Sequence, residues 1–257
     1  MQVDIISDIH LDFWLKRGNE KEILKFITNI IRPNIDSEVL IIGGDIGHYN
    51  NQNLKLLNLL QNFYQKIFFV FGNHDLYLIS RKQRDKYKFS LNRLKELIEN
   101  LPENVMFLNG FEYEYKGVRF AGSGLWYEVK DINLWLKKMN DAIYIIEEKI
   151  FNIDYDSYGK KIIYKFNPLN FYQKEMEKLR QISNVDIMIS HISPYLPEKE
   201  EFYYFNGENE IKRIGAKYWI FGHIHYPLEI NFGNTKLICN PLGYKNNNFC
   251  IKTISIK

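Results

Sequence analysis

The sequence has few of the features that mark disulfide-rich, membrane or disordered proteins. It contains only two cysteines, Cys239 and Cys250, with no Cys-x-x-Cys spacing, which argues against a disulfide framework or a cysteine-based metal site. No apolar run approaches membrane-spanning length, and no repeat or low-complexity linker is present. The net charge of +3 is too small to require nucleic acid as a partner. These absences indicate an ordinary soluble globular protein with no membrane segment.

The composition supports one folded domain over residues 1–257. Hydrophobic residues make up 46% of the chain and charged residues 25%, which supplies ample material for a core. The first strand already carries candidate site residues, which leaves no room for a cleaved signal peptide. The scarcity of cysteine fits a reducing compartment. We therefore expect a cytoplasmic protein.

Apolar strands and amphipathic helices alternate through the first third of the chain. Strands are predicted at 3–7, at 39–43 and up to residue 71, with helices over 20–31 and 52–64. Two such crossovers imply a parallel sheet covered by helices. Further strands and helices follow, including one helix over 131–150 and an irregular basic stretch at 81–88, while 151–166 is predicted as a loop or small hairpin. The number of strands favours two sheets face to face with helices outside.

Polar residues able to bind metal stand where the predicted strands end. Five of the six histidines lie at such ends, which scattered packing histidines would not do. The clearest case is an apolar run that stops at Gly72-Asn73-His74-Asp75. The other ends carry Asp8 and His10, Asp45, His191, and His223 with His225.

The spacing of these residues suggests two metal ions. Asp8 and His10 are two apart, and in an extended chain such side chains point to one side with α-carbons roughly 6.5–7 Å apart, close enough to hold one ion. His223 and His225 repeat this spacing. The Asp45 carboxylate could bridge two ions, and Asn73 and His191 offer further ligands. Mixed Asp, His and Asn ligands favour manganese, iron or zinc over calcium or magnesium.

A pair of such ions suits the hydrolysis of phosphoric esters. Ions held roughly 3.5–4 Å apart generate a hydroxide and hold the entering and leaving oxygens. His74 stands beside a ligand without being an evident ligand, so it is free to protonate the leaving oxygen.

The ordered set of motifs resembles the signature of the calcineurin-like metallophosphoesterases. The resemblance spans residues 4–225 and rests on Asp8-x-His10, Gly44-Asp45, Gly72-Asn73-His74-Asp75, His191 and Gly222-His223-x-His225. It implies an α/β fold, a four-layer αββα sandwich of two mixed sheets flanked by helices, and a dinuclear site. One ion would be held by Asp8, His10, Asp45 and His225, and the other by Asp45, Asn73, His191 and His223, with His74 as proton donor.

Two positions depart from the pattern of this family. Many members carry an acidic residue three places after the bridging aspartate, where this chain has His48; a histidine there is similar to the nuclease branch that acts in double-strand-break repair. Trp126, Met139-Asn140-Asp141 and the segment from Cys239 to Tyr244 resemble small bacterial and phage members of the family. In that group an arginine often stands where this chain has Leu242, so a phosphate contact from that position is not expected.

Several residues also allow a purely structural interpretation. Asp8 alone could cap a turn, and a lone His191 would more often be a core histidine. Asp75 could orient His74 or hold the turn, and His48 could assist His74 or lie exposed in a turn. The basic stretch 81–88 is more often a solvated loop than a recognition surface. Trp126 and Tyr127 could belong to the core edge or form a stacking wall for a base or sugar.

These observations predict a phosphoesterase with two divalent metal ions, manganese first, with iron, zinc or nickel as alternatives. Phosphomonoesters or phosphodiesters would be cleaved by a metal-bound hydroxide, with His74, Asp75 and His48 in the catalytic group. The substrate would be small, phosphorylated or nucleotide-like. Two rivals stay open: a metal-dependent nuclease of the same fold, for which nucleic acid is the substrate, and a non-catalytic scaffold. The oligomeric state is not predicted.

Overall fold

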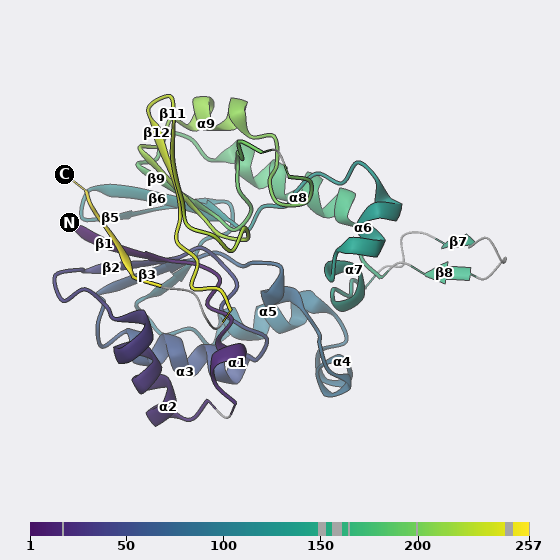
Figure 1. Cartoon of the computed structure of the whole chain (residues 1–257), viewed down its shortest axis with the longest axis horizontal. Helices are drawn as coiled ribbons and strands as arrows, with labels where there is room; N and C mark the ends of the chain where they lie inside the picture. Colours follow the sequence, from purple (N-terminus) through teal and green to yellow (C-terminus); the bar gives the residue numbers. More distant parts are fainter. Residues whose placement is uncertain are drawn as a thin grey trace.

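Two mixed β-sheets form the centre of the computed structural model (Figure 1). The structure describes the chain except residues 17, 149–152, 156–160, 164, 199, 245–248 and 257, and for 153–155 and 161–163 it describes the backbone alone. The first sheet has the order β13-β1-β2-β3-β4 and the second β11-β12-β10-β9-β6-β5. The strands of the first are β1 (Gln2–Ile6), β2 (Val39–Ile42), β3 (Lys66–Phe69), β4 (Val105–Phe107) and β13 (Lys252–Ser255). Those of the second are β5 (Phe111–Tyr115), β6 (Val118–Ser123), β9 (Ile187–Ser190), β10 (Tyr218–Phe221), β11 (Leu228–Phe232) and β12 (Thr235–Cys239).

Alternating side chains along each strand divide the core into layers. Val3 and Ile5 of β1 pack between the two sheets, against residues such as Ile187 and Ile220 from the second sheet, whereas Ile6 faces the helices. Strands buried on both faces read as continuous apolar runs. This is why the strands stood out so clearly in the sequence.

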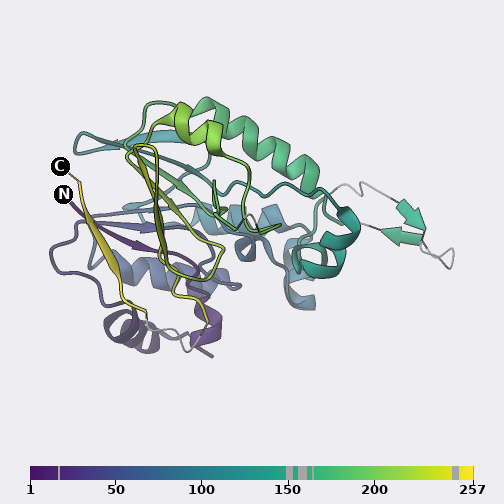
Figure 2. The same cartoon turned by 45° about the horizontal axis from the view of Figure 1, so that its top comes forward.

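Helices cover the outer face of each sheet (Figures 1 and 2). The first sheet is covered by α2 (Glu20–Phe26) with the π-helical turn η1 (Ile27–Ile31), α3 (Asn50–Leu60) and α5 (Ser90–Glu99). The second is covered by α8 (Pro168–Gln181) and α9 (Glu208–Ile214). The shorter elements are α1 (Leu11–Trp14), η2 (His74–Leu76), α4 (Arg81–Tyr87), α6 (Ile132–Lys138), α7 (Asp141–Tyr144), β7 (Ile153–Tyr155) and β8 (Lys161–Ile163). The four-layer αββα arrangement expected from the sequence is confirmed.

The helix predicted over 131–150 is wrong beyond its first turns. After α6 the chain is extended at Met139 (φ −101°, ψ 125°), α7 follows, and residues 145–148 are not helical; 149 and 150 lie outside the described residues. The break carries Asp141 into the interior, where it is fully buried and hydrogen-bonded. Apolar spacing alone does not reveal that a buried carboxylate needs this turn. Of the predicted loop or hairpin at 151–166, β7 and β8 pair antiparallel as a hairpin, and much of the rest lies outside the described residues.

The basic stretch predicted as irregular forms α4. The Ser80 hydroxyl accepts a hydrogen bond from the Gln83 backbone N–H at 3.2 Å, and the Gln83 side chain accepts one from the Ser80 N–H. This reciprocal capping box starts a helix despite the run of like charges. Ser90 lies in the first turn of the next helix, α5, whose cap residue is Phe89, and the Ser90 hydroxyl accepts from Ile146 N–H.

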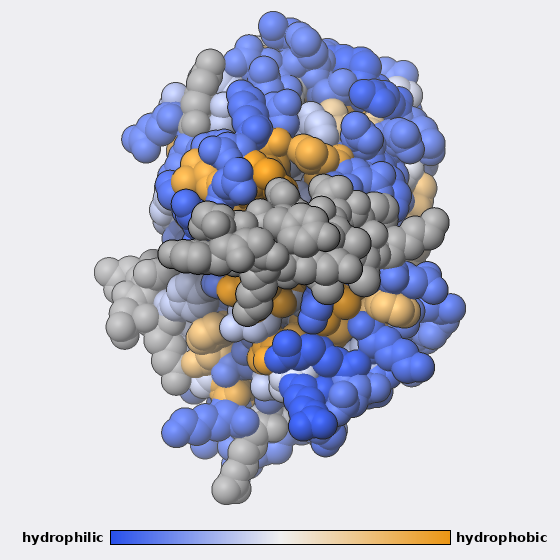
Figure 3. All heavy atoms as spheres, turned by 90° about the vertical axis from the view of Figure 1, so that its right-hand side faces the viewer, coloured by the Kyte–Doolittle hydropathy of each residue, from blue (hydrophilic) through white to orange (hydrophobic). Residues whose placement is uncertain are grey.

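The surface agrees with the absence of long apolar segments. None of the helices in the described part of the chain combines the length and apolarity needed to cross a membrane. Figure 3 views the end of the molecule where α6 and α7 lie; hydrophilic residues cover most of this face, and hydrophobic residues gather toward its middle.

Candidate metal centre

The predicted ligands all lie just beyond strand ends of the two sheets. β1, β2 and β3 run parallel, as do β9 and β10, so the carboxyl ends of each set meet at one edge of a sheet. The loops after these strands carry Asp8 and His10, Asp45, Asn73, His191, and His223 with His225. The first sheet supplies every oxygen ligand, and the second supplies imidazoles only.

Five of these seven residues have a left-handed backbone. The φ angles are 50° at Asp8, 44° at His10, 57° at Asp45, 72° at His223 and 56° at His225. Such angles are uncommon for residues other than glycine and cluster at functional sites. The expected extended chain at Asp8 and His10 is therefore wrong, and so is its repeat at His223 and His225. The chain turns sharply at each ligand, and this turning aims the side chains.

Four side chains converge as a first group: Asp8, His10, Asp45 and His225. One ligand atom from each lies within 4.8 Å of all the others. The Nε2 atoms of His10 and His225 are 3.2 Å apart, and His225 Nε2 is 3.4 Å from Asp8 Oδ1. Two imidazole nitrogens bound at about 2.05 Å to one tetrahedral ion would be about 3.3 Å apart. The two imidazole nitrogens therefore lie at the spacing of two ligands of one metal ion.

A second group gathers on the other side of Asp45. His191 Nδ1 is 2.8 Å from the Gly43 carbonyl, which can only accept, so Nδ1 carries the proton. His191 Nε2 then faces two oxygens, Asn73 Oδ1 at 3.1 Å and Asp45 Oδ2 at 3.4 Å. His223 donates from Nε2 to the Phe202 carbonyl at 3.0 Å, which leaves its Nδ1 as the lone-pair atom. Its ring meets the His191 ring edge to face, with centroids 5.1 Å apart.

The charges of the side chains favour the binding of cations in both groups. Burial would raise the pKa of Asp45, but His191 and His74 hold it well below its ordinary value. Burial would lower the pKa of His191, but the Asp45 charge outweighs it and raises the pKa to about 9. Asp45 Oδ2 is buried with no hydrogen-bond partner, a costly state for a carboxylate oxygen unless an ion binds there. The residues present therefore fit two metal ions that share Asp45.

Glycines let the site loops approach one another closely. A Cβ on Gly44, whose φ is +88°, would lie 2.5 Å from His191 Nδ1, and one on Gly72 would lie 2.1 Å from Asp45 Oδ1. Both distances are shorter than any real contact. Both glycines are thus required by space, and Gly44 by its backbone angle as well.

His74 is the inner end of a hydrogen-bonded chain of three side chains. His74 Nδ1 lies 2.9 Å from His48 Nε2, and His48 Nδ1 lies 2.7 Å from Asp12 Oδ2. His48 is only 5% exposed, so the alternative of an exposed turn residue is wrong. Asp12 accepts the proton of His48 Nδ1, which leaves His48 Nε2 to accept from His74 Nδ1. Burial lowers the pKa of His74 well below its ordinary value.

Asp75 holds the turns of the site. Its carboxylate accepts hydrogen bonds from the backbone N–H groups of Gly72 at 2.8 Å, Asp45 at 2.9 Å and Ile46 at 3.1 Å. None of its hydrogen bonds in the described chain reaches the His74 ring. Of its two expected roles, holding the turn is the one that matches these contacts.

A buried arginine, Arg93, hydrogen-bonds to both the loop after β2 and the loop after β3. Arg93 of α5 has no exposed surface and donates to the carbonyls of His74, Asp75 and Tyr77 and to that of Gly47. A rigid guanidinium can satisfy several carbonyls at once, which a lysine could not. The loops that carry Asp45 and Asn73 are therefore fixed relative to each other.

Asn73 is oriented by a buried carboxylate. Its Nδ2 donates to Asp141 Oδ1 at 2.8 Å, and the Tyr77 hydroxyl donates to the same oxygen at 2.5 Å. Tyr127 donates to the other Asp141 oxygen. These bonds leave Asn73 Oδ1 directed at His191. Trp126 and Tyr127 are 1% and 0% exposed, so they belong to the core and cannot stack on a ligand.

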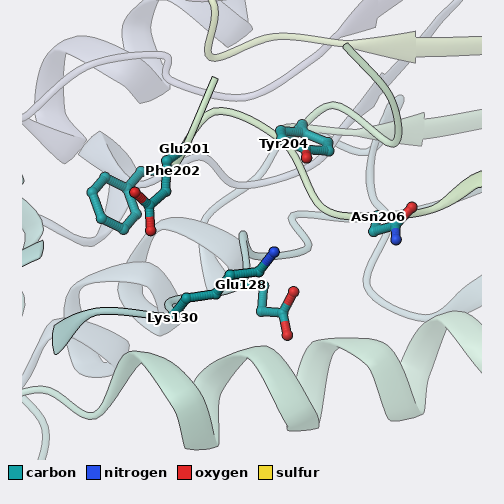
Figure 4. A pocket seen from close by; sticks show the side chains of 6 residues that line it. All are labelled: Glu128, Lys130, Glu201, Phe202, Tyr204 and Asn206. Atoms are coloured by element: carbon teal, nitrogen blue, oxygen red, sulfur yellow. The ribbon is translucent and has the colours of Figure 1, made fainter. Parts of the chain in front are cut away.

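The metal groups open into a cavity of about 290 Å³. It is lined by Asn73, His74, Tyr77, Lys138, Met139, Asn140, Tyr203, His223, Ile224, His225 and Tyr244. A neighbouring cavity of about 320 Å³ contains none of the predicted ligands; in Figure 4 the side chains of Glu128, Lys130 and Glu201 line it together with Phe202. Leu242 is fully buried in the core below the site, so position 242 presents nothing to a phosphate.

Four contributors to the site were not identified from the sequence: Asp12, Arg93, Tyr203 and Tyr244. Asp12 continues the alternation Asp8-x-His10-x-Asp12, a signal that could have been used. Arg93 shares the helical spacing of Ser90, Leu94 and Leu97, which places it on the buried face of α5. Nothing in the sequence around Tyr203 or Tyr244 indicates that these residues lie at the site.

Comparisons with known proteins agree with this geometry. Residues 1–227 match the sequence model of the family described as calcineurin-like phosphoesterase. Uncharacterized protein L509 of Acanthamoeba polyphaga mimivirus is 25% identical over 95% of this chain and 92% of its own length.

Among solved structures, phosphopantetheinyl hydrolase from Mycobacterium tuberculosis superposes with a TM-score of 0.62 at 14% identity, over 98% of this chain and 95% of that chain. TT1561 of Thermus thermophilus gives 0.54 at 12% identity, over 95% and 89%. At these identities the two structures show a shared fold. With its strand-end ligands in place and the family match covering most of its length, the chain belongs to the calcineurin-like phosphoesterase family.

Proposed function

We propose that the protein, acting as one domain over residues 1–257, hydrolyses phosphoric monoesters or diesters with two divalent metal ions. The observation that carries this proposal is the convergence of Asp8, His10, Asp45 and His225 within 4.8 Å, with Asn73 and His191 on the other side of the same Asp45 oxygen. The mixture of carboxylate, amide and imidazole ligands favours manganese, with iron, zinc or nickel as alternatives. Bound ions would supply Lewis-acid chemistry, activating water and neutralising the phosphoryl charge.

The chain's own residues would orient the ester and deliver a proton. His74 Nδ1 is bound to His48, so the other ring nitrogen of His74 is the one available to the leaving oxygen. Asp12 and His48 orient the His74 ring, whose second nitrogen donates to the leaving oxygen when His74 is in its doubly protonated, imidazolium form. Asp75 and Arg93 hold the loops and take no part in proton transfer.

The proposal is tested with purified protein stripped of metal and reloaded with manganese, nickel or zinc. We expect hydrolysis of aryl phosphate mono- or diesters that depends on added metal, and none by Asp45→Asn under the same loading. The metal content of both proteins is measured in parallel by mass spectrometry. Metal-loaded wild-type protein that leaves a broad panel of phosphoric esters intact would overturn the proposal and revive the scaffold alternative.

A nuclease of the same fold is the second candidate. His48 is hydrogen-bonded to His74, and the helix α4, which exposes Lys82 and Arg84, is tied to the His48 carbonyl through Gln83 at 2.6 Å. Metal-dependent degradation of single-stranded DNA or RNA would favour it.

A further inference from the structure

Two tyrosines stand beside the metal ligands at the mouth of the cavity. The Tyr244 ring stacks on the His10 ring, with centroids 5.0 Å apart and an interplanar angle of 18°, and meets His225 edge to face at 5.0 Å. The Tyr203 ring lies 5.3 Å from the His223 ring. Both tyrosines line the cavity. One aromatic ring therefore accompanies a ligand of the first group, and the other accompanies a ligand of the second.

Backbone hydrogen bonds tie both rings to the site. The residue before Tyr203 is Phe202, whose carbonyl accepts from His223. The residue before Tyr244 is Gly243, whose N–H donates to the Asp8 carbonyl at 2.9 Å and whose carbonyl accepts from the Trp14 indole at 3.1 Å. The rings are thus placed by the same segments that place the ligands. Aromatic rings held in this way offer planar platforms at little entropic cost.

The charge of the cavity lining suits a singly charged phosphate. Lys138 is the one lysine or arginine among the described residues that line it, and Lys138 is exposed at the end of α6. Leu242, beside Tyr244, is buried and adds no charge. A monoester carries about two negative charges near neutral pH, as phosphorylated side chains do, whereas a diester carries one. With few fixed cations beyond the metal ions, the site neutralises the diester more completely.

We infer that the substrate is a small phosphodiester that carries a planar base or aryl ring, with Tyr203 and Tyr244 as the stacking platforms for its two arms. A diester has two arms leading away from phosphorus, and one tyrosine ring lies beside a histidine of each group. Its volume of about 290 Å³ lies at the lower end of small-ligand sites, which favours a nucleotide-sized ester. This inference rests on the proposed hydrolase function and deepens it.

The reaction is a balanced hydrolysis with water as the only co-reactant. The water oxygen forms a bond to phosphorus, and the bond from phosphorus to one ester oxygen breaks. The leaving alcohol oxygen takes a proton, and the products are a monoester and an alcohol. Tyr203 and Tyr244 contact the two groups esterified to the phosphate and take no part in these bond changes.

Three esters with the same p-nitrophenyl leaving group test the inference on manganese-loaded protein. They are the p-nitrophenyl ester of thymidine monophosphate, methyl p-nitrophenyl phosphate and p-nitrophenyl phosphate. We expect the highest kcat/KM on the thymidine diester. Tyr203→Leu and Tyr244→Leu should lower that kcat/KM by about 5- to 100-fold, the range produced by losing one base–aromatic stack. Methyl p-nitrophenyl phosphate has one ring, the p-nitrophenyl group, and no base. The tyrosine variant that has lost the platform for thymine should therefore change the rate on this ester by less than about twofold.

Tyr226 offers a matched control. It is 42% exposed, follows His225 directly and does not line the cavity, so Tyr226→Leu should leave all three rates unchanged. A second readout avoids turnover: calorimetric binding of thymidine monophosphate, which has one ring, should weaken in the tyrosine variant whose platform faces the thymine and not in Tyr226→Leu.

The outcomes separate this inference from the function it rests on. Equal rates on the thymidine and methyl diesters, p-nitrophenyl phosphate as the best substrate, or tyrosine variants without effect would each overturn the inference while leaving a phosphoesterase. Failure to hydrolyse any of the three esters would overturn both.

Discussion

The two halves of the metal centre hold their ligands in different ways. In the first group, Asp8, His10 and His225 all have left-handed backbone angles, and the Asp8 carboxylate accepts a hydrogen bond from the His223 N–H at 3.0 Å. In the second group, each ligand besides Asp45 is held by a further hydrogen bond: Asn73 by Asp141, and His191 and His223 by backbone carbonyls. Left-handed backbone is concentrated in the first half, although His223 shares it, whereas every side chain besides Asp45 in the second half is oriented by a hydrogen bond to the scaffold.

This difference teaches where each half is vulnerable. The second half can be weakened through residues that never touch an ion, because its ligand orientation depends on them. The first half depends on the ligands themselves and on the local backbone. Asp45 belongs to both halves and should be the most sensitive position.

Replacing Asp45 by asparagine should have the largest effect. Asp45 Oδ2 lies 3.4 Å from His191 Nε2 and 3.8 Å from His10 Nε2, so its loss removes the one oxygen shared by both groups. Turnover should fall to that of metal-free protein, and bound metal should drop in both groups. Metal analysis together with initial rates measures this, with circular dichroism as the control for folding. A variant that keeps its full metal content and activity would contradict a shared bridge.

The next largest effects are expected from substitutions that remove one ligand from only one of the two groups. His225→Ala should lose the ion of the first group and His223→Ala that of the second, each lowering turnover about 1,000-fold, the upper range for one lost electrostatic stabiliser. Electron paramagnetic resonance of manganese-loaded protein should change from a coupled pair to an isolated ion in both variants. If either variant loses both ions or keeps the coupled pair, the division into two groups is wrong.

The sequence was sufficient for the fold and for placing the candidate ligands at strand ends, for one physical reason. Strands buried on both faces read as apolar runs, and a ligand such as Asp45 or His191 follows directly where a run stops, so both could be located by position alone. The grouping of the ligands followed from the family resemblance. Spacing alone suggested that His223 and His225 bind the same ion. In the structure the chain turns at both residues, and their side chains belong to different groups.

The parts that could not be predicted depend on tertiary hydrogen bonds. The break after α6 exists because Asp141 reaches Asn73, a residue 68 positions earlier in the chain. The link from Asp12 to His48 spans 36 positions, and Arg93 joins loops that its own helix pattern does not reveal. Local signals mark the positions of Asp12 and Arg93 but not the partners they reach, whereas the capping box that begins α4 is a purely local motif and could have been recognised.

Proton delivery lies outside both metal groups and should be separable from them. His74→Asn should retain both ions but lower turnover about 100-fold on esters with poor alkyl leaving groups, because general acid catalysis matters most there. On p-nitrophenyl esters, which need little protonation, the loss should be small. Asp12→Asn should show the same dependence on the leaving group with a smaller loss. Equal losses on alkyl and aryl esters would remove His74 from the role of proton donor.

Asp141→Asn sharpens the comparison between the halves. The variant disturbs the acceptor that fixes Asn73, so affinity for the second ion should weaken by about 10- to 100-fold while the first ion stays bound. Asp4→Asn is the matched control, since Asp4 is equally buried and accepts from the hydroxyls of Ser37 and Tyr64, which precede β2 and β3 at the edge of the sheet opposite the ligands. Metal titration followed by calorimetry should show one weakened step in Asp141→Asn and none in the control. Weakening of both steps would mean that the halves are not independent.

The smallest effect is expected at the exposed cations of α4. Lys82 and Arg84 lie outside the metal cavity, whereas Gln83 between them is buried against the loop of His48. Lys82→Ser combined with Arg84→Ser should change rates on small esters by less than about twofold, because exposed charges outside the cavity are screened by salt. If the same double variant lost metal-dependent activity on single-stranded DNA, with a reduced salt dependence, these cations would contact phosphates. The substrate would then be a polynucleotide, and the two tyrosines at the cavity mouth would receive a base from a strand that α4 guides.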